Sequence, residues 1–141
     1  MMRTSAAPNR TVLVATFSSN IFGIARHTGQ VLWEVPLGSY GEADLHVLDE
    51  VTIAITHSDL HFLVTLTGQV LARVPLGMNY PRRPTSLVDE GHLYVAANGE
   101  IVCFTLRGER VWHQPFKGKG MGSVALGLPG NVRQADDVGS K

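Results

Sequence analysis

The sequence predicts an all-β protein built from three copies of one structural unit. Two observations support this prediction. Glycine-centred segments recur at Gly29, Gly68 and Gly108, a period of about 40 residues; they read HTGQVLWEVPLG, LTGQVLARVPLG and LRGERVWHQPFKG. Short runs rich in β-branched and aromatic residues precede each of them, and helical periodicity is missing. Self-similarity at this period is typical of solenoids, propellers and other repeat folds.

A full unit has the pattern of four strands in about 40 residues, which is the pattern of a β-propeller blade. The order is a first strand, an Asp-Glu turn, a hairpin, a glycine turn and a last strand. In the second copy these strands read LHVLDE, VTIAITH, DLHFLVT and QVLARVP, and in the third TSLVDE, HLYVAAN, EIVCFTL and ERVWHQP.

The two ends of the chain complement each other. The first copy, with TVLVATF, NIFGIAR and QVLWEVPL, has no first strand, whereas the segment 122–128 near the C-terminus reads as a fourth first strand with no hairpin after it. We therefore predict a three-blade domain over residues 10–131, with a flexible lead at 1–9 and a flexible polar tail at 132–141.

Three blades are too few to close a propeller, so the sequence predicts closure by oligomerisation. The C-terminal strand of one chain would complete the first blade of another. The exchanged strands carry Val12, Val14, Val124, Leu126 and Leu128. A homodimer then forms a six-bladed ring with twofold symmetry. A homotrimer with nine blades and an unequal partner that supplies the missing blades are the alternatives.

The copies resemble the PQQ-like (quinoprotein-type) propeller repeat over about residues 10–130, in VLVAT…IFGIARHTGQVLWEV and LYVAA…IVCFTLRGERVWHQ. The resemblance implies that a tryptophan docks between neighbouring blades. Trp33 and Trp112 match it, and Ala72 in the middle copy implies one weaker contact. Enzymes of the family hold a quinone and a metal and usually carry vicinal cysteines, whereas this sequence has one cysteine. The resemblance therefore implies a non-catalytic member with no cofactor.

The composition of the chain indicates which classes of partner are not expected. Twelve acidic and twelve basic residues cancel, so a nucleic-acid partner is not expected. No run approaches the roughly 20 apolar residues that span a bilayer, and the N-terminus has no apolar signal region. With its single cysteine, the sequence predicts a cytoplasmic protein that does not associate with membranes.

Histidines and one cysteine are the first candidates for chemistry. His57 and His61 flank a hairpin tip and could bind zinc, which favours histidine and carboxylate ligands. His61 shares its repeat position with apolar residues, which favours a satisfied buried side chain, and the question of a metal there stays open. Cys103 aligns with Leu63 and Ile24, so we predict an inert core thiol.

Paired acids at Asp49-Glu50 and Asp89-Glu90 are the other candidates for acid–base chemistry. They recur at one turn of the unit, and turn formation explains them without catalysis.

The connections between the last strand of one blade and the first of the next emerge on one face of a propeller, which we call the loop face. Loops on a rigid scaffold are common binding sites. Charged and aromatic residues gather there: Tyr40, Glu42, Tyr80, Arg82, Arg83, Lys117 and Lys119. We predict that a protein partner docks on them; solvated basic loops without a partner are an equally favoured alternative.

The sequence thus predicts a non-enzymatic scaffold or binding module without metal or cofactor. A lectin-like carbohydrate binder is one rival, because Tyr40 and Tyr80 lie one period apart, although Gly120 breaks the series in the third copy. A propeller hydrolase or lyase is the other. The copies differ mostly by apolar exchanges and show no cluster of His, Asp and Glu that breaks the repeat, which argues against it.

Overall fold

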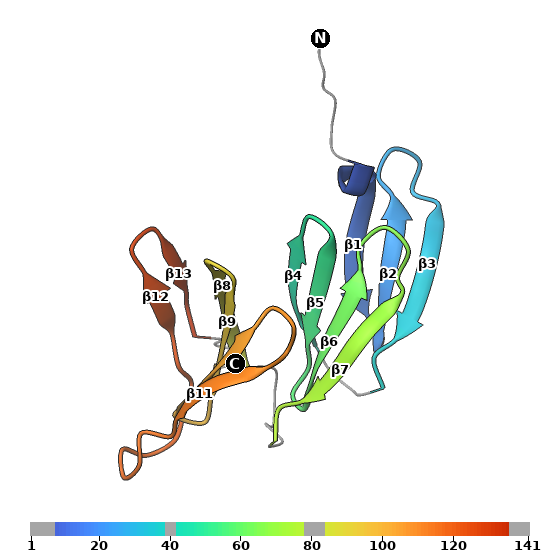
Figure 1. The fold of residues 1–141 in the computed structure, drawn as a ribbon. Helices are drawn as coiled ribbons and strands as arrows, with labels where there is room; N and C mark the ends of the chain where they lie inside the picture. The colour runs from blue at the N-terminus through green and yellow to red at the C-terminus, as the bar shows by residue number, and fades with distance from the viewer. Residues whose placement is uncertain (1–7, 39–41, 78–83, 136–141) are drawn as a thin grey trace.

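The chain is described here by a computed structural model that covers residues 8–38, 42–77 and 84–135 (Figure 1). These residues form one short 3₁₀ turn, Pro8–Thr11, and 13 strands. No helix in the described ranges has the length and apolar character needed to cross a bilayer.

The strands form three antiparallel sheets that follow one another along the chain, and a short C-terminal hairpin. Each of the three sheets is called a blade. The first blade consists of β1 (Val12–Phe17), β2 (Asn20–Ala25) and β3 (Val31–Pro36). The second consists of β4 (Asp44–Leu48), β5 (Val51–Ile55), β6 (Asp59–Val64) and β7 (Val70–Pro75). The third consists of β8 (Thr85–Asp89), β9 (His92–Ala97), β10 (Glu100–Thr105) and β11 (Arg110–Gln114), and the hairpin of β12 (Leu126–Leu128) and β13 (Asn131–Arg133). Figure 1 shows the sheets side by side in this order.

This all-β arrangement is propeller-like, as the repeats predicted. Strands β4, β8 and β12 begin at Asp44, Thr85 and Leu126, so the first strands of successive blades start at equal intervals along the chain. Within each four-stranded blade, neighbours in sequence are neighbours in the sheet, which is the meander of a propeller blade.

Successive blades pack face to face, and each blade uses one face for the blade before it and the other for the blade after it. We call the face that packs on the following blade the front face, and the opposite one the back face. The first joint buries Val12, Val14, Ile21 and Leu37 of the first blade against Ala54 and Leu63 of the second. The second joint buries Ile53, Ile55, Leu60, Phe62 and Leu76 of the second blade against Leu93, Val95, Val102 and Phe104 of the third.

The C-terminal segment differs from the prediction of one strand over 122–128. Strand β12 is confined to Leu126–Leu128, and Val124 lies before it. Gly120 and Gly122 have φ values of 95° and 146°, which extended strands do not adopt, so no strand begins at the predicted position 122. A turn through Gly130 leads into β13, which the prediction missed and which reaches into the range assigned to the polar tail.

Strand β13 lies on the β8 side of β12. Asn131 Nδ2 donates to the carbonyl of Val88 and to Asp89 Oδ1, both at 3.0 Å, and Arg133 reaches Asp44 of β4 at 2.8 Å. The opposite edge of β12 therefore pairs with no strand among the described residues. The same holds for the edge of β1 that faces away from β2.

The position predicted for Cys103 was wrong by one residue. Cys103 pairs with Trp112 across the sheet, and the corresponding pairs are Gly23 with Trp33 and Phe62 with Ala72. Cys103 is thus equivalent to Gly23 and Phe62, not to Ile24 and Leu63. A slip of one residue exchanges the two faces of a strand, so Cys103 belongs to the front face.

Candidate binding sites

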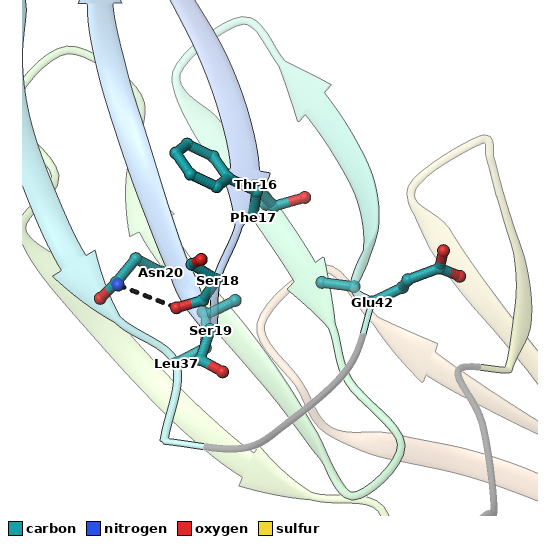
Figure 2. A pocket seen from close by; sticks show the side chains of 8 residues that line it. Thr16, Phe17, Ser18, Ser19, Asn20, Leu37 and Glu42 are labelled. Atoms are coloured by element: carbon teal, nitrogen blue, oxygen red, sulfur yellow. Dashed lines mark hydrogen bonds between the residues drawn. The ribbon is translucent and has the colours of Figure 1, made fainter.

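A pocket of about 530 Å³ opens on the loop face of the first blade (Figure 2). Its lining joins the β1–β2 hairpin tip to the connection that leads into β4: Thr16, Phe17, Ser18, Ser19, Asn20, Leu37, Glu42 and Ala43. Asn20 Nδ2 donates to the Ser18 carbonyl at 3.0 Å and braces the tip. Phe17, which is 66% exposed, stacks on Phe22 with ring centroids 5.0 Å apart. An exposed aromatic ring beside polar groups is a suitable surface for a ligand.

A second pocket, of about 240 Å³, occupies the equivalent place on the third blade. It lies between the β9–β10 tip and the connection into β12, and its lining is Gly99, Phe116, Lys119, Gly120, Met121, Gly122 and Ser123. The amide of Gly99 donates to the Gly122 carbonyl at 3.0 Å, which ties the connection to the tip. Phe116 is 43% exposed. The repeat thus places a pocket with an aromatic side chain at each of these two blades.

Three of the predicted partner-binding residues fall within the described part of the chain. Glu42 lines the first pocket and Lys119 the second, and Lys117 is exposed in the same connection as Lys119. Tyr40, Tyr80, Arg82 and Arg83 lie outside the described residues. The two pockets therefore carry opposite charges at their rims, a difference that the sequence-based grouping of these residues did not anticipate.

A polar cluster joins the first strands of two blades to the C-terminal hairpin, and the sequence did not reveal it. Ser86 of β8 is fully buried and donates a hydrogen bond to Asp44 of β4. His46 Nε2 lies 2.7 Å from Ser86 Oγ and 3.7 Å from Asp44 Oδ2. Arg133 Nη2 donates to Asp44 Oδ1 at 2.8 Å. Asp44 and Arg133 are 89 residues apart and outside any motif, so only folding brings them together.

Ser86, His46 and Asp44 are the residue types of a hydrolase triad, but the hydrogen bonds between them do not run in the order of a triad. The carboxylate of Asp44 cannot donate, so the hydroxyl proton of Ser86 points to Asp44, and His46 must donate its Nε2 proton to the Ser86 oxygen. A nucleophilic serine would instead donate to the histidine. Burial lowers the pKa of His46, which keeps the ring neutral and suits this donor role. The cluster therefore clamps blades together and does not activate Ser86.

His61 is buried, as predicted, but it is not satisfied. Its Nε2 has no hydrogen-bond partner among the described residues, and only 6% of the residue is exposed. Burial lowers its pKa, the nearby Arg73 lowers it further, and Asp59 acts against both. Asp59 itself accepts from Ser58 and from Arg73, at 2.8 and 3.2 Å. Across the described ranges, no group of three or more His, Cys, Asp and Glu side chains is placed to hold a metal ion.

Cys103 is 1% exposed, and burial raises the pKa of its thiol. A thiol with a raised pKa forms little thiolate at neutral pH, which is the form that reacts. The side chain acts as part of the sheet packing, as predicted, although on the other face.

The first joint depends on Trp33, as the resemblance implied. Its indole crosses to the second blade, where Nε1 donates to the Thr65 carbonyl at 3.1 Å. The ring lies over two glycines: a Cβ built on Gly23 or Gly68 would come within 2.1 and 2.5 Å of indole atoms. Gly68 also has a φ of 77°, so both space and backbone require glycine there.

The second joint has no gap at Ala72. A Cβ built on Gly108, the counterpart of Gly68, would come within 2.7 Å of Val74 Cγ2 and 3.2 Å of the Phe62 ring. Phe62 stands across the strand pair from Ala72 and fills the space that a tryptophan would take. Phe62 of the neighbouring strand therefore replaces the contact that was expected to be weaker at Ala72.

No protein-family model matches the sequence, and no curated protein matches it. Solved structures do match. The designed protein Ika8 aligns with a TM-score of 0.57 and 16% identity over 86% of this chain and 41% of its own. BamB from Moraxella catarrhalis aligns with a TM-score of 0.47 and 18% identity over 74% of this chain and 45% of its own. The chain spans less than half the length of either, and at these identities the likeness concerns the fold alone.

Proposed function

We propose that this chain is a non-enzymatic β-propeller scaffold that assembles with a second copy of itself and docks a macromolecular partner on its loop face. The observation that carries the proposal is that, within the described ranges, the first blade has three strands and the C-terminal hairpin two, whereas each of the other two blades has four. Strand β1 is open on the side away from β2, and β12 is open on the side away from β13, among the described residues. Open edges of this kind are templates for strand pairing between chains.

Strand exchange between two copies would use both edges at once. Val12 and Val14 are buried in the first joint, so β1 is held firmly as one half of the pair. Leu126 and Leu128 lie in β12 and would be the other half, with Val124 leading into it. Two such pairings per dimer give a closed ring, and three such pairings would close a trimer in the same way.

Partner docking is supported by the repetition of pockets on the loop face. The pockets of the first and third blades occupy equivalent places, and their linings include Phe17 with Glu42 and Phe116 with Lys119. In a ring of two chains, acidic and basic rims would alternate. A partner with patches of both signs fits such a surface, and its binding would weaken with salt, because exposed charges are screened beyond about 10 Å at 0.1 M.

Sedimentation equilibrium tests the assembly. The full chain should sediment at twice the 15.3 kDa of one chain, and a truncated chain that lacks residues 122–141 should lose assembly. A homotrimer would sediment at three times the mass of one chain. A folded 15.3-kDa species at every concentration would overturn self-assembly.

The loop face is tested separately with two probes, a polyglutamate peptide and heparin, titrated at low and high salt. Lys117→Glu with Lys119→Glu should weaken binding of these acidic probes at low salt. Arg107→Glu, an exposed charge change in the glycine turn of the same blade, is the control and should leave binding unchanged. The control changes the net charge by two units and the double variant by four, so a loss in the control about half that of the double variant would show that net charge, not the loop face, governs binding.

A lectin-like carbohydrate binder is the second candidate. The exposed rings of Phe17 and Phe116 favour it, because sugars stack on aromatic faces beside polar groups. Glycan-array binding that is lost in Phe17→Ala and Phe116→Ala, and that does not depend on salt, would support this candidate over the acidic partner.

A further inference from the structure

The glycine turns of the first two blades form equivalent seats, and one of them is open. We call the turn that ends at Gly29 the first-blade seat, and its counterpart at Gly68 the second-blade seat. In both, the glycine amide donates at 2.8 Å to the carbonyl four residues earlier. In both, the amide of the residue three before the glycine, Arg26 or Thr65, donates at 2.9 Å to a carbonyl that lies beside the preceding strand.

The occupancy of the two seats differs. Trp33 covers the second-blade seat, whereas a Cβ built on Gly29 would meet nothing within 4 Å. Gly29 has a φ of 81°, close to the 77° of Gly68, so its backbone is already in the conformation that accepts an indole. The first-blade seat is therefore formed, and no residue of the described ranges covers it.

At the other end of the chain, the third blade presents the matching tryptophan. Leu93, Val95, Val102 and Phe104 point into the second joint, so their strand neighbours Tyr94 and Cys103 belong to the front face. Trp112 pairs with Cys103 and lies 6.1 Å from Tyr94 between ring centroids. It is 43% exposed, in the place that Trp33 occupies on the first blade.

We propose that Trp112 of one copy occupies the first-blade seat of a second copy, with its indole Nε1 donating to the Arg26 carbonyl as Trp33 donates to that of Thr65. This rests on the proposed self-assembly and names its contact. The occupant is a second copy because the fold already contains both halves of the contact, with the same front-to-back sense as the two internal joints.

The apolar back face of the first blade supports the same occupant. Leu13 lies between Val12 and Val14, which point into the first joint, so it points the other way and is 58% exposed. Its cross-strand partner Ile24 shares that face. The new joint would bury this face against the front face of the third blade and continue the blade-on-blade packing seen twice within the chain.

Two single variants block the joint from opposite sides. Trp112→Ala removes the ring, and Gly29→Asn fills the seat. Asparagine tolerates positive φ, so the second variant keeps the turn. Gly91→Asn is the control, because Gly91 has a φ of 79° and nothing within 4 Å, but it lies in the β8–β9 turn. We expect each blocking variant to weaken association by about 30-fold or more, as for a central aromatic anchor, and the control to leave it unchanged.

Mixing the two blocked variants gives the sharper test. A head-to-tail joint needs Trp112 from one chain and Gly29 from the other, so each variant alone has no complete joint. The mixture has one: Trp112 of the Gly29→Asn chain on Gly29 of the Trp112→Ala chain. Sedimentation velocity should show association of the mixture that neither variant shows alone. Circular dichroism and melting curves confirm that each variant is folded.

The outcomes separate the two proposals. A wild-type chain that stays a folded monomer overturns self-assembly, and with it this joint. A wild-type oligomer that neither variant weakens leaves self-assembly standing and overturns the joint. Loss of association in both variants without recovery on mixing would also overturn it, because a head-to-tail joint between Trp112 and Gly29 must be restored in the mixture.

Discussion

The two joints between blades solve the same packing problem with different residues. In the first, a glycine faces a tryptophan across the β2–β3 pair, Gly23 with Trp33, and the ring covers Gly68. In the second, the large ring stands on the other strand, Phe62 opposite Ala72, and covers Gly108 together with Val74. The joints also differ in polarity: His61 and the hydrogen-bonded pair Thr52 and Thr65 are buried in the second blade's back face.

What repeats is therefore the volume of a cross-strand pair and not the residue at one position. Close packing requires that the space between blades be filled, but either strand can supply the atoms. A tryptophan at one fixed position is one solution among several, and its loss at Ala72 does not indicate a weak joint.

Removal of the ring from the second joint should have the largest effect. Phe62 is 2% exposed, so Phe62→Ala should lower the free energy of unfolding by about 3–5 kcal/mol, from lost burial and the cavity left behind. Phe17→Ala is the control, because Phe17 is 66% exposed and should cost less than about 1 kcal/mol. Urea denaturation measures both, and similar losses would show that the second joint is not tightly packed.

A transplant tests whether the pair, and not the position, matters. The double variant Phe62→Gly with Ala72→Trp gives the second joint the residue pair of the first. We expect it to be about 2 kcal/mol more stable than Phe62→Gly alone, because the indole would again cover Gly108. No recovery in the urea midpoint would mean that the bulky side chain must stand on β6.

Much of this architecture was predictable from the sequence, because repeats and turn glycines are local signals. The three sheets, the order of their strands and the docking of Trp33 follow from the spacing and the family resemblance. The front-face position of Cys103 did not follow, because the glycine turn of the third blade is one residue shorter than the others. The Gly108 amide donates to the carbonyl of Thr105, three residues earlier, whereas the Gly68 amide reaches back four residues to Val64. An alignment made from the turn glycines therefore places Cys103 one position too far along the strand.

The features that the sequence did not predict depend on contacts between residues distant in the sequence. Strand β13 is three residues long and is held by Asn131 and Arg133 to strands β8 and β4, which no local pattern could indicate. The pockets combine a hairpin tip with a connection, so the sequence could place Glu42 and Lys119 on the loop face but could not show the hollows beside them.

The glycine under Trp33 gives a third, intermediate test. Gly68→Ala adds a Cβ within 2.5 Å of the indole at a φ of 77°, whereas Gly91→Ala imposes the same backbone strain at 79° with nothing within 4 Å. Strain alone costs about 1–2 kcal/mol. We expect Gly68→Ala to cost about 1–2 kcal/mol more than Gly91→Ala in thermal unfolding. Equal costs would show that the indole moves aside freely.

The smallest effect concerns the histidine that distinguishes the first joint. The strand register makes His61 equivalent to Val102, an apolar residue in the second joint. Burial holds the pKa of His61 below the ordinary value of 6.5, so the unfolded chain binds a proton at a higher pH than the folded one. Stability must then fall as the pH drops below about 6.5, because protons favour the unfolded state.

His61→Leu should reduce this loss and should raise stability at pH 7 by about 1 kcal/mol, because it removes a buried nitrogen without a partner in the described structure. Part of the pH dependence should remain, since burial also lowers the pKa of His46. The reciprocal change Val102→His should import the same acid sensitivity into the second joint. Urea midpoints at pH 5 and pH 7 measure both. A variant at position 61 with the wild-type pH profile would show that the first joint does not owe its acid sensitivity to this histidine.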